Sequence, residues 1–348
     1  MTQITKSAFG TTKGGQAASL YTLKGEKLEY TVTDFGANIV SIIVPDAKGN
    51  TVDVALGFDD VTGYEDNGSF FGACVGPGAN RVANAKFTID GIEYNLAVND
   101  GPNNLHSDFD NGFHKRMWNA EVVGEELKLS LQMKDGEMGF PGNLDVSVTY
   151  SIDNEDGLKI HYYITTDKPA YINMTNHSYF NLSGHDSGKI LDHTLQMNCS
   201  NYTPVIAGAI PTGEIASVSG TPLDFTSAKT VGEEIEADFE QLKLVQGYDH
   251  NFVVDNADGS LKVIATVEDP KSGRFMDVLT DQPGVQFYAG NCIAPVVGKG
   301  GAEYDKRVGL CLESQVYPNS INQEGFPNAV YTLERPYDTV TIYKFGAK

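Results

Sequence analysis

Histidine is the side chain best suited to proton transfer in this 348-residue chain, because its ordinary pKa of about 6.5 lies near neutrality. The chain contains seven histidines. Four of them have settings that predict a solvated or structural role: His114 and His185 in polar loops, His161 on the solvent face of a strand, and His193 on a partly buried strand face. His106, His177 and His250 remain as candidates for chemistry.

A proton donor must work with a proton acceptor on the other side of a small polar substrate. Glu313 lies in "VGLCLESQVYPN", a strand-like segment with apolar neighbours, which suits a catalytic base. Strand alternation places Glu313 on one face with Gly309 and Cys311, and two leucines on the other. Taken singly, such a glutamate is more often a surface or salt-bridged residue, and Asp249 and Arg81 are no more informative alone.

The spacings typical of other catalytic classes are missing. The chain has no H-E-x-x-H, H-x-H or C-x-x-C pattern, so we expect no metal site. It also lacks the G-x-S-x-G elbow of serine hydrolases, a P-loop and a dinucleotide-binding G-x-G-x-x-G. With these classes excluded, catalysis by a paired acid and base is the remaining hypothesis.

The elements that must position these residues are strands. Alternating or β-branched runs occur throughout the chain, as in residues 19–23, 27–33, 37–44 and 128–133. Segments 85–96 and 146–166 each predict a hairpin with a two-residue turn, at Asp90-Gly91 and Asp156-Gly157 respectively. Only residues 229–239 look helical. Long loops at 97–118 and 291–307 are expected to carry the functional residues.

No linker, low-complexity tract or fixed-period repeat divides the chain. We therefore expect residues 1–348 to form one large antiparallel all-β domain, a sandwich of two big sheets with a few short helices. Apolar residues make up 41% of the chain, enough for a sizeable core.

The charge and the cysteines limit the possible partners and the compartment. The formal net charge of −21 repels phosphate backbones and anionic lipid, so we expect no nucleic acid and no membrane partner. The N-terminus shows no secretory signal, and no apolar run is long enough to span a bilayer. The four scattered cysteines indicate reduced thiols in a cytoplasmic protein.

Several segments together resemble the aldose 1-epimerase (galactose mutarotase) family over nearly the whole chain. Each segment alone is weak evidence, but they occur in the order typical of the family. The matching segments are "VTDFGANIVSIIVPD" (32–46), "GPGANRVANAKFTIDGIEYNL" (76–96), "NNLHS" (103–107), "NMTNHSYFNLSG" (173–184), "GTPLDF" (220–225), "GYDHNFVV" (247–254), "QPGVQFYAGN" (282–291) and "LCLESQVYPNSIN" (310–322). The resemblance implies a galactose mutarotase-like supersandwich.

The resemblance also implies a reaction, the conversion between the α and β anomers of an aldohexose such as galactose or glucose. It implies His177 as the acid that protonates the ring oxygen and Glu313 as the base that takes the C1 hydroxyl proton. A neighbouring carboxylate is expected to raise the pKa of His177. His106 is expected to point at the ring or C1 oxygen. No cofactor is implied, because the reaction involves no redox step or group carrier.

Four further matches imply groups that hold the sugar hydroxyls: Asn80, Arg81, Asp249 and Gln286. One position departs from the family pattern, since Pro77 stands where many members have an arginine. This departure puts the substrate preference in doubt. We expect a small aldose as the only ligand, and a monomer or weak homodimer.

Three rival functions remain open. A non-catalytic carbohydrate-binding β-sandwich need not keep both His177 and Glu313. A hexose-6-phosphate 1-epimerase needs a basic cluster, whereas only Arg81 occurs in the matched motifs. A glycoside-processing enzyme needs two opposed carboxylates, for which only Glu313 and Asp249 are candidates.

Overall fold

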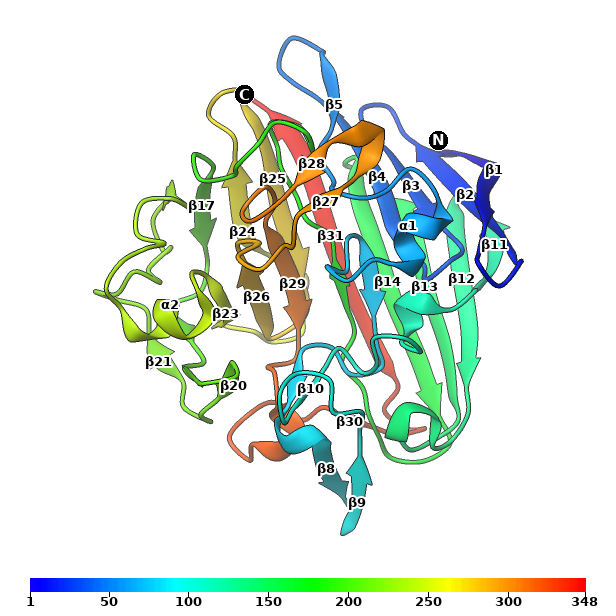
Figure 1. The fold of residues 1–348 in the computed structure, drawn as a ribbon, viewed down its shortest axis with the longest axis vertical. Helices are drawn as coiled ribbons and strands as arrows, with labels where there is room; N and C mark the ends of the chain where they lie inside the picture. Colours follow the sequence, from blue (N-terminus) through cyan, green and yellow to red (C-terminus); the bar gives the residue numbers. More distant parts are fainter.

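Three large antiparallel sheets form the architecture (Figure 1). A computed structural model describes all residues, 1–348. The largest sheet has nine strands, and the chain crosses it from its middle third to its C-terminus. In spatial order these strands are β11 (Asn119–Val123), β12 (Glu126–Met133), β13 (Leu144–Ile152), β14 (Gly157–Thr166), β31 (Tyr337–Ala347), β25 (Arg274–Thr280), β24 (Lys262–Glu268), β17 (Thr194–Met197) and β22 (Lys229–Thr230).

Two five-stranded sheets complete the architecture. The first is an N-terminal meander that contacts the large sheet through β2 and β4. Its strands are β1 (Gln3–Thr11), β2 (Ala17–Lys24), β3 (Glu29–Thr33), β4 (Ile39–Pro45) and β5 (Thr51–Asp53). The second holds most of the functional candidates. Its strands are β21 (Ala216–Ser217), β18 (Asn201–Tyr202), β23 (Asp249–Val253), β26 (Gly284–Tyr288) and β29 (Cys311–Gln315).

Short two-stranded pairs fill the space beside these sheets. Two of them bear on the site: β6 (Ala73–Val75) with β16 (Thr175–His177), and β7 (Arg81–Val82) with β10 (Asn104–Leu105). The others are β8 (Lys86–Ile89) with β9 (Ile92–Asn95), β15 (Ala170–Tyr171) with β30 (Val330–Tyr331), β19 (Val205–Ile206) with β20 (Ile210–Pro211), and β27 (Val296–Val297) with β28 (Glu303–Tyr304).

The core follows from strand alternation. Along β13, residues Leu144, Val146, Val148 and Tyr150 are buried, while the residues between them are more exposed. Such side chains belong to one cluster of 66 buried residues that joins the sheets. Full burial of one large apolar side chain contributes about 1.5–3 kcal/mol, so this shared core holds the sheets against each other. The predicted antiparallel all-β class is confirmed.

One hairpin turn was predicted correctly and one was not. Asp90 and Gly91 both have positive φ, of 50° and 79°, as a type I′ turn requires. The second turn is longer than predicted, because Asp153 accepts hydrogen bonds from the backbone N–H groups of Glu155 and Gly157. Gly157 already pairs with β31, where a side chain on it would collide with Ile342.

The helices also differ from expectation. Residues 229–239 contain no α-helix, since Val231 and Gly232 donate backbone hydrogen bonds to His193 and Leu191 instead of closing helical turns. The helix α2 (Glu240–Val245) begins just beyond this segment. A second helix, α1 (Val61–Glu65), is capped by Asp60, but it is too short for periodicity to reveal. Neither α-helix has the length and the apolar run that a membrane-spanning helix requires.

A substitution at Gly72, just before β6, would test how tightly the pair β6–β16 is packed against the N-terminal sheet. Gly72 and Gly124 both have positive φ, of 67° and 62°, so alanine is strained at either position. A Cβ at Gly72 would lie 1.9 Å from the Ile39 carbonyl oxygen, whereas a Cβ at Gly124 would meet nothing within 4 Å.

We expect Gly124→Ala to lower the free energy of unfolding by about 1–2 kcal/mol, and Gly72→Ala by about 4 kcal/mol or more. Urea and thermal unfolding followed by circular dichroism would measure both. Equal losses for the two variants would show that the close approach at Gly72 is not constraining.

Candidate active site

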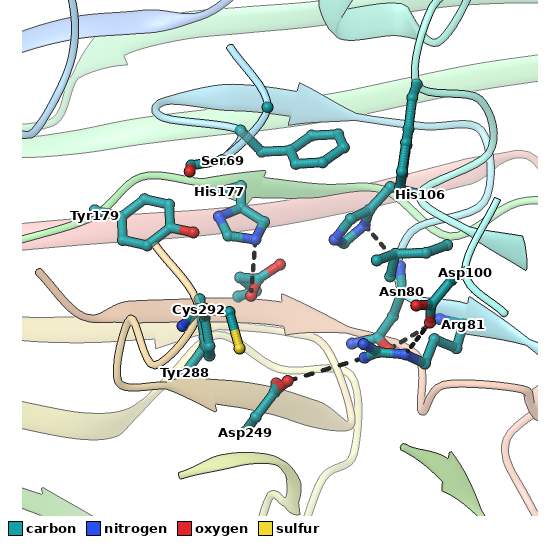
Figure 2. Close-up of a pocket in the computed structure, with 15 residues that line it drawn as sticks. Ser69, Asn80, Arg81, Asp100, His106, His177, Tyr179, Asp249, Tyr288 and Cys292 are labelled. Carbon is teal, nitrogen blue, oxygen red and sulfur yellow. Dashed lines mark hydrogen bonds and ion pairs between the residues drawn. The ribbon is translucent and has the colours of Figure 1, made fainter. Parts of the chain in front are cut away.

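A cavity of about 310 Å³ lies where β16 and the β7–β10 pair meet the sheet that contains β23, β26 and β29 (Figure 2). This volume is at the small end of ligand pockets, which suits a ligand the size of one sugar ring. Its lining residues are Gly68, Ser69, Phe70, Asn80, Arg81, Asp100, Leu105, His106, Phe109, His177, Tyr179, Asp249, Tyr288, Cys292 and Glu313.

His177 and Glu313 face each other in this cavity, with His177 Nε2 3.7 Å from Glu313 Oε1. Backbone pairing explains the approach. Phe180, three residues after His177, forms an antiparallel bridge with Leu310, three residues before Glu313. This bridge brings the two functional residues opposite each other. Both are buried, with 5% and 2% of their surfaces exposed.

The His177 ring is held on several sides. Phe70 is stacked on it at a centroid distance of 5.8 Å, and Tyr179 lies at 5.0 Å. Its Nδ1 lies 3.5 Å from the Cys311 thiol, so Nε2 is the nitrogen that faces Glu313. Cys311 and Glu313 point to the same side of β29 because they are two residues apart on one strand.

Burial is the largest cause of the pKa shifts of both His177 and Glu313. It lowers the pKa of His177 to about 4, so the expected upward shift is wrong. Burial, reinforced by Asp249, raises the pKa of Glu313, although Arg81 opposes the shift. Both shifts favour the uncharged forms. These two directions favour a neutral His177 and a protonated Glu313 in the free protein.

His106 is a fixed hydrogen-bond donor. Its Nδ1 accepts a hydrogen bond from the Asn80 backbone N–H at 3.1 Å, so the neutral ring carries its proton on Nε2. Burial also lowers the pKa of His106, which keeps the ring neutral. Its ring meets the His177 ring edge-on at a centroid distance of 5.3 Å. His106 can thus donate to a ligand oxygen beside the pair.

The spacing of His106, His177 and Glu313 alone would permit a metal ion, since their ligand atoms all lie within 4.8 Å of one another. The hydrogen bonding does not suit one. Because His106 Nδ1 accepts from a backbone N–H, its Nε2 bears a proton and has no free lone pair for a metal. The cluster fits proton transfer better than metal coordination.

Arg81 and Asp249 form the polar end of the cavity, where Figure 2 shows them pointing toward each other. Arg81 Nε donates to Asp100 at 2.8 Å, and its Nη1 lies 3.9 Å from Asp249. Burial raises the pKa of Asp249 while the Arg81 charge lowers it. Arg81 is the one cationic side chain in the lining, against the carboxyls of Asp100, Asp249 and Glu313.

The structure brings together six of the seven residues assigned from the sequence. The exception is Gln286, which does not line the cavity and instead donates to Asp249 Oδ1 at 2.6 Å. His250 also lies outside the lining, fully buried next to Tyr202. Of the two loops expected to carry function, 97–118 supplies four lining residues, and 291–307 supplies Cys292 alone.

Sequence reasoning missed the aromatic wall of the cavity. Tyr179 and Tyr288 had an available signal, because each lies two residues from an assigned residue, His177 or Gln286, on an extended segment. Phe70 had none. It has a φ of 61°, which is rare for an aromatic residue and cannot be read from its neighbours in the sequence.

Comparison with known proteins agrees with this site. A family model described as aldose 1-epimerase matches residues 19–344. Galactose mutarotase from Bos taurus is 39% identical, with 99% of each chain covered. Aldose 1-epimerase from Escherichia coli K12 is 37% identical, covering 96% of this chain and 97% of that protein.

Solved structures give the same result. Galactose 1-epimerase from Lactobacillus acidophilus superposes with a TM-score of 0.86 at 25% identity, and an aldose epimerase homologue from C. elegans with 0.85 at 26%. Each superposition covers 100% of this chain and 99% of the other. Because the matches run through every segment that builds the cavity, this chain belongs to the aldose 1-epimerase family of isomerases.

Proposed function

We propose that this protein is an aldose 1-epimerase that interconverts the α and β anomers of aldohexoses, with galactose and glucose as the substrates to test. One observation carries the proposal: a buried histidine and a buried glutamate face each other 3.7 Å apart in a cavity of monosaccharide size. Family membership supports the same reaction.

In this mechanism, His177 gives a proton to the ring oxygen while Glu313 removes the proton of the C1 hydroxyl. The bond between C1 and the ring oxygen breaks, and C1 becomes a free aldehyde. Rotation about the bond between C1 and C2 presents the other face of the carbonyl. On closure, the roles reverse, and the C1 oxygen regains a proton as the ring oxygen loses one.

The reactive protonation state is reached without a proton from solvent. In the free protein, Glu313 holds the proton, and its transfer to His177 produces the acid and the base together. A bound sugar favours this ion pair, because its hydroxyl groups form hydrogen bonds with the charged groups. Glu313 lines the cavity and presents Oε1 beside His177 Nε2, where it can accept from the C1 hydroxyl, whereas its Oε2 is buried without a hydrogen-bond partner.

The remaining polar residues hold the sugar. His106 Nε2–H donates to the ring or C1 oxygen and stabilises charge that develops there. Asn80, Arg81 and Asp249 offer donors and acceptors to the other hydroxyls. Gln286 contributes through Asp249 rather than by contact with the sugar.

A phosphorylated sugar fits the cavity poorly. Arg81 already bonds Asp100 and lies near Asp249, so it is not free to neutralise a phosphate. The carboxyls in the lining and the net charge of −21 both repel an anion. The sandwich as a purely binding module is also disfavoured, because burying an acid–base pair costs stability that binding alone does not require.

We further propose that the protein works in the cytoplasm, without a cofactor, as a monomer or weak homodimer. All four cysteines are free, and Cys74, Cys199 and Cys311 are buried. Free thiols are typical of a reducing compartment. The acid–base mechanism uses no redox group or carrier.

The acid and the base can be tested by polarimetry on freshly dissolved α-D-galactose and α-D-glucose. We expect His177→Asn and Glu313→Gln each to lower kcat about 10²–10⁴-fold, because each removes one proton-transfer group. His161→Asn is the control, since His161 lies on the large sheet and bonds Asp338. Turnover near the wild-type level in either site variant would refute the assignment.

The pH profile is the second test. Below about pH 4, His177 and Glu313 are both protonated and the base is lost; above the raised pKa of Glu313, the acid is lost. We therefore expect kcat/KM to fall on the acid side near pH 4, rather than near the ordinary histidine value of about 6.5. An acid limb near 6.5 would contradict the burial argument.

Acid unfolding must be separated from this effect. Burial lowers the pKa of His193 and His250 to about 4, so the unfolded chain binds more protons below about pH 6.5 and stability falls as the pH falls. Circular dichroism at each pH, and assays after return to neutrality, would identify any loss that comes from unfolding.

Substrate charge gives a third test. We expect kcat/KM for glucose 6-phosphate to be at least about 100-fold below that for glucose, because the cavity has no free cation for the phosphate. The same polarimetric or coupled assay would compare the two sugars at equal ionic strength. Comparable values would favour a sugar-phosphate epimerase.

A further inference from the structure

A chain of buried side-chain amides runs from Asn80, which lines the cavity, to Gln315 and Gln286 behind it, and the acid–base pair does not use it. It starts at the Arg81 backbone N–H, which donates to Asn80 Oδ1 at 2.8 Å. Asn80 Nδ2 donates to Gln315 Oε1 at 3.4 Å, and Gln315 Nε2 donates to Gln286 Oε1 at 3.2 Å. Gln286 Nε2 then donates to Asp249 Oδ1 at 2.6 Å. We call Asn80, Gln315 and Gln286 the amide relay.

The direction of the amide relay is set by its two ends. The Asp249 carboxylate can only accept, so Gln286 must turn its NH₂ group toward it and its oxygen away. The Arg81 N–H can only donate, so Asn80 must present its oxygen there. Gln315 then has one consistent orientation between them. Every donor in the relay points toward Asp249, an arrangement in which each bond strengthens the next.

The surroundings are shaped to hold Gln315. Its side chain is fully buried, so water cannot replace a lost hydrogen bond. Gly284 lies opposite Gln315 in the β26–β29 ladder. A Cβ on Gly284 would lie 2.7 Å from Asn251 Oδ1, which accepts a second hydrogen bond from Gln315 Nε2 at 3.1 Å.

We propose that Gln315 is a positioning residue for sugar binding, which fixes Asp249 relative to the Asn80–Arg81 segment through the amide relay. The two ends come from segments distant in the sequence, β23 and the approach to β7, and both line the cavity. Gln315 follows Glu313 by two residues on β29, so both side chains project from the same face of one strand. The relay that positions Asp249 is therefore fixed relative to the proposed base. This inference rests on the proposed function.

The relay acts on groups that bind the sugar before and during ring opening. Its loss should therefore weaken substrate and transition state together, which raises KM and leaves kcat nearly unchanged. We expect Gln315→Met, which keeps the length but removes the hydrogen bonds, to raise KM for galactose about three- to tenfold. We expect kcat to stay within about threefold.

A double-mutant cycle separates positioning from general stability. In an Asp249→Ala background, the relay has no acceptor at its end, so Gln315→Met should change KM by less than about twofold. Gln282→Met is the matched control, because Gln282 is also buried but bonds Tyr337 outside the cavity. That control should lower the unfolding temperature without changing KM.

Several results would overturn the proposal: an unchanged KM in Gln315→Met, equal effects of Gln315→Met with and without Asp249, or a similar KM increase in Gln282→Met. If Gln315→Met does not fold, the same KM measurement can be made on Gln286→Met, which removes the hydrogen bond that Gln286 donates to Asp249. An inactive wild-type protein would instead refute the proposed function, which keeps the two failures distinct.

Discussion

Backbone pairing between segments distant in the sequence holds His177 and Glu313 opposite each other in the cavity. Two ionisable groups must be kept 3.7 Å apart and away from water, although burial penalises the charge on each. The backbone achieves this by pairing. β16 is bonded to β6, and the bridge between Phe180 and Leu310 ties the same segment to the start of β29. Because strands set distances through their hydrogen bonds, the pair is held without a direct short contact.

The cost of this arrangement is visible around the cavity. Glu313 Oε2 lacks a partner, and Phe70, Asn80 and His106 all have positive φ. Backbone strain of this kind costs of order 1–3 kcal/mol per residue and persists only where neighbours fix it. Asn80 and His106 fix each other through two backbone-linked hydrogen bonds, one to the ring and one to the Asn80 carbonyl oxygen.

The sequence allowed the strand-rich class and most of the cavity to be predicted, for different physical reasons. Strand alternation is a local property, so segments such as 128–133 could be read directly. The pKa of His177 could not, because burial depends on what packs over the ring, and Phe70 comes from a distant segment. Gln286 was matched by motif, yet alternation alone cannot tell a side chain that enters the cavity from one that stops behind Asp249. The segment 229–239 has a helix-like composition, but tertiary backbone pairing with residues 191–193 outweighs it.

Three residues on β29 contact different parts of the site, and the strand fixes their positions relative to one another. Cys311, Glu313 and Gln315 occupy alternate positions, so all three project to one side of the strand. The first contacts the His177 ring, the second faces its Nε2, and the third is the middle member of the amide relay. The β26 ladder fixes all three at once, with Gln286 directly opposite Glu313. A slip of one residue in this ladder would turn Glu313 away from the cavity and move Cys311 and Gln315 from their partners, so this side of the site depends on sheet register.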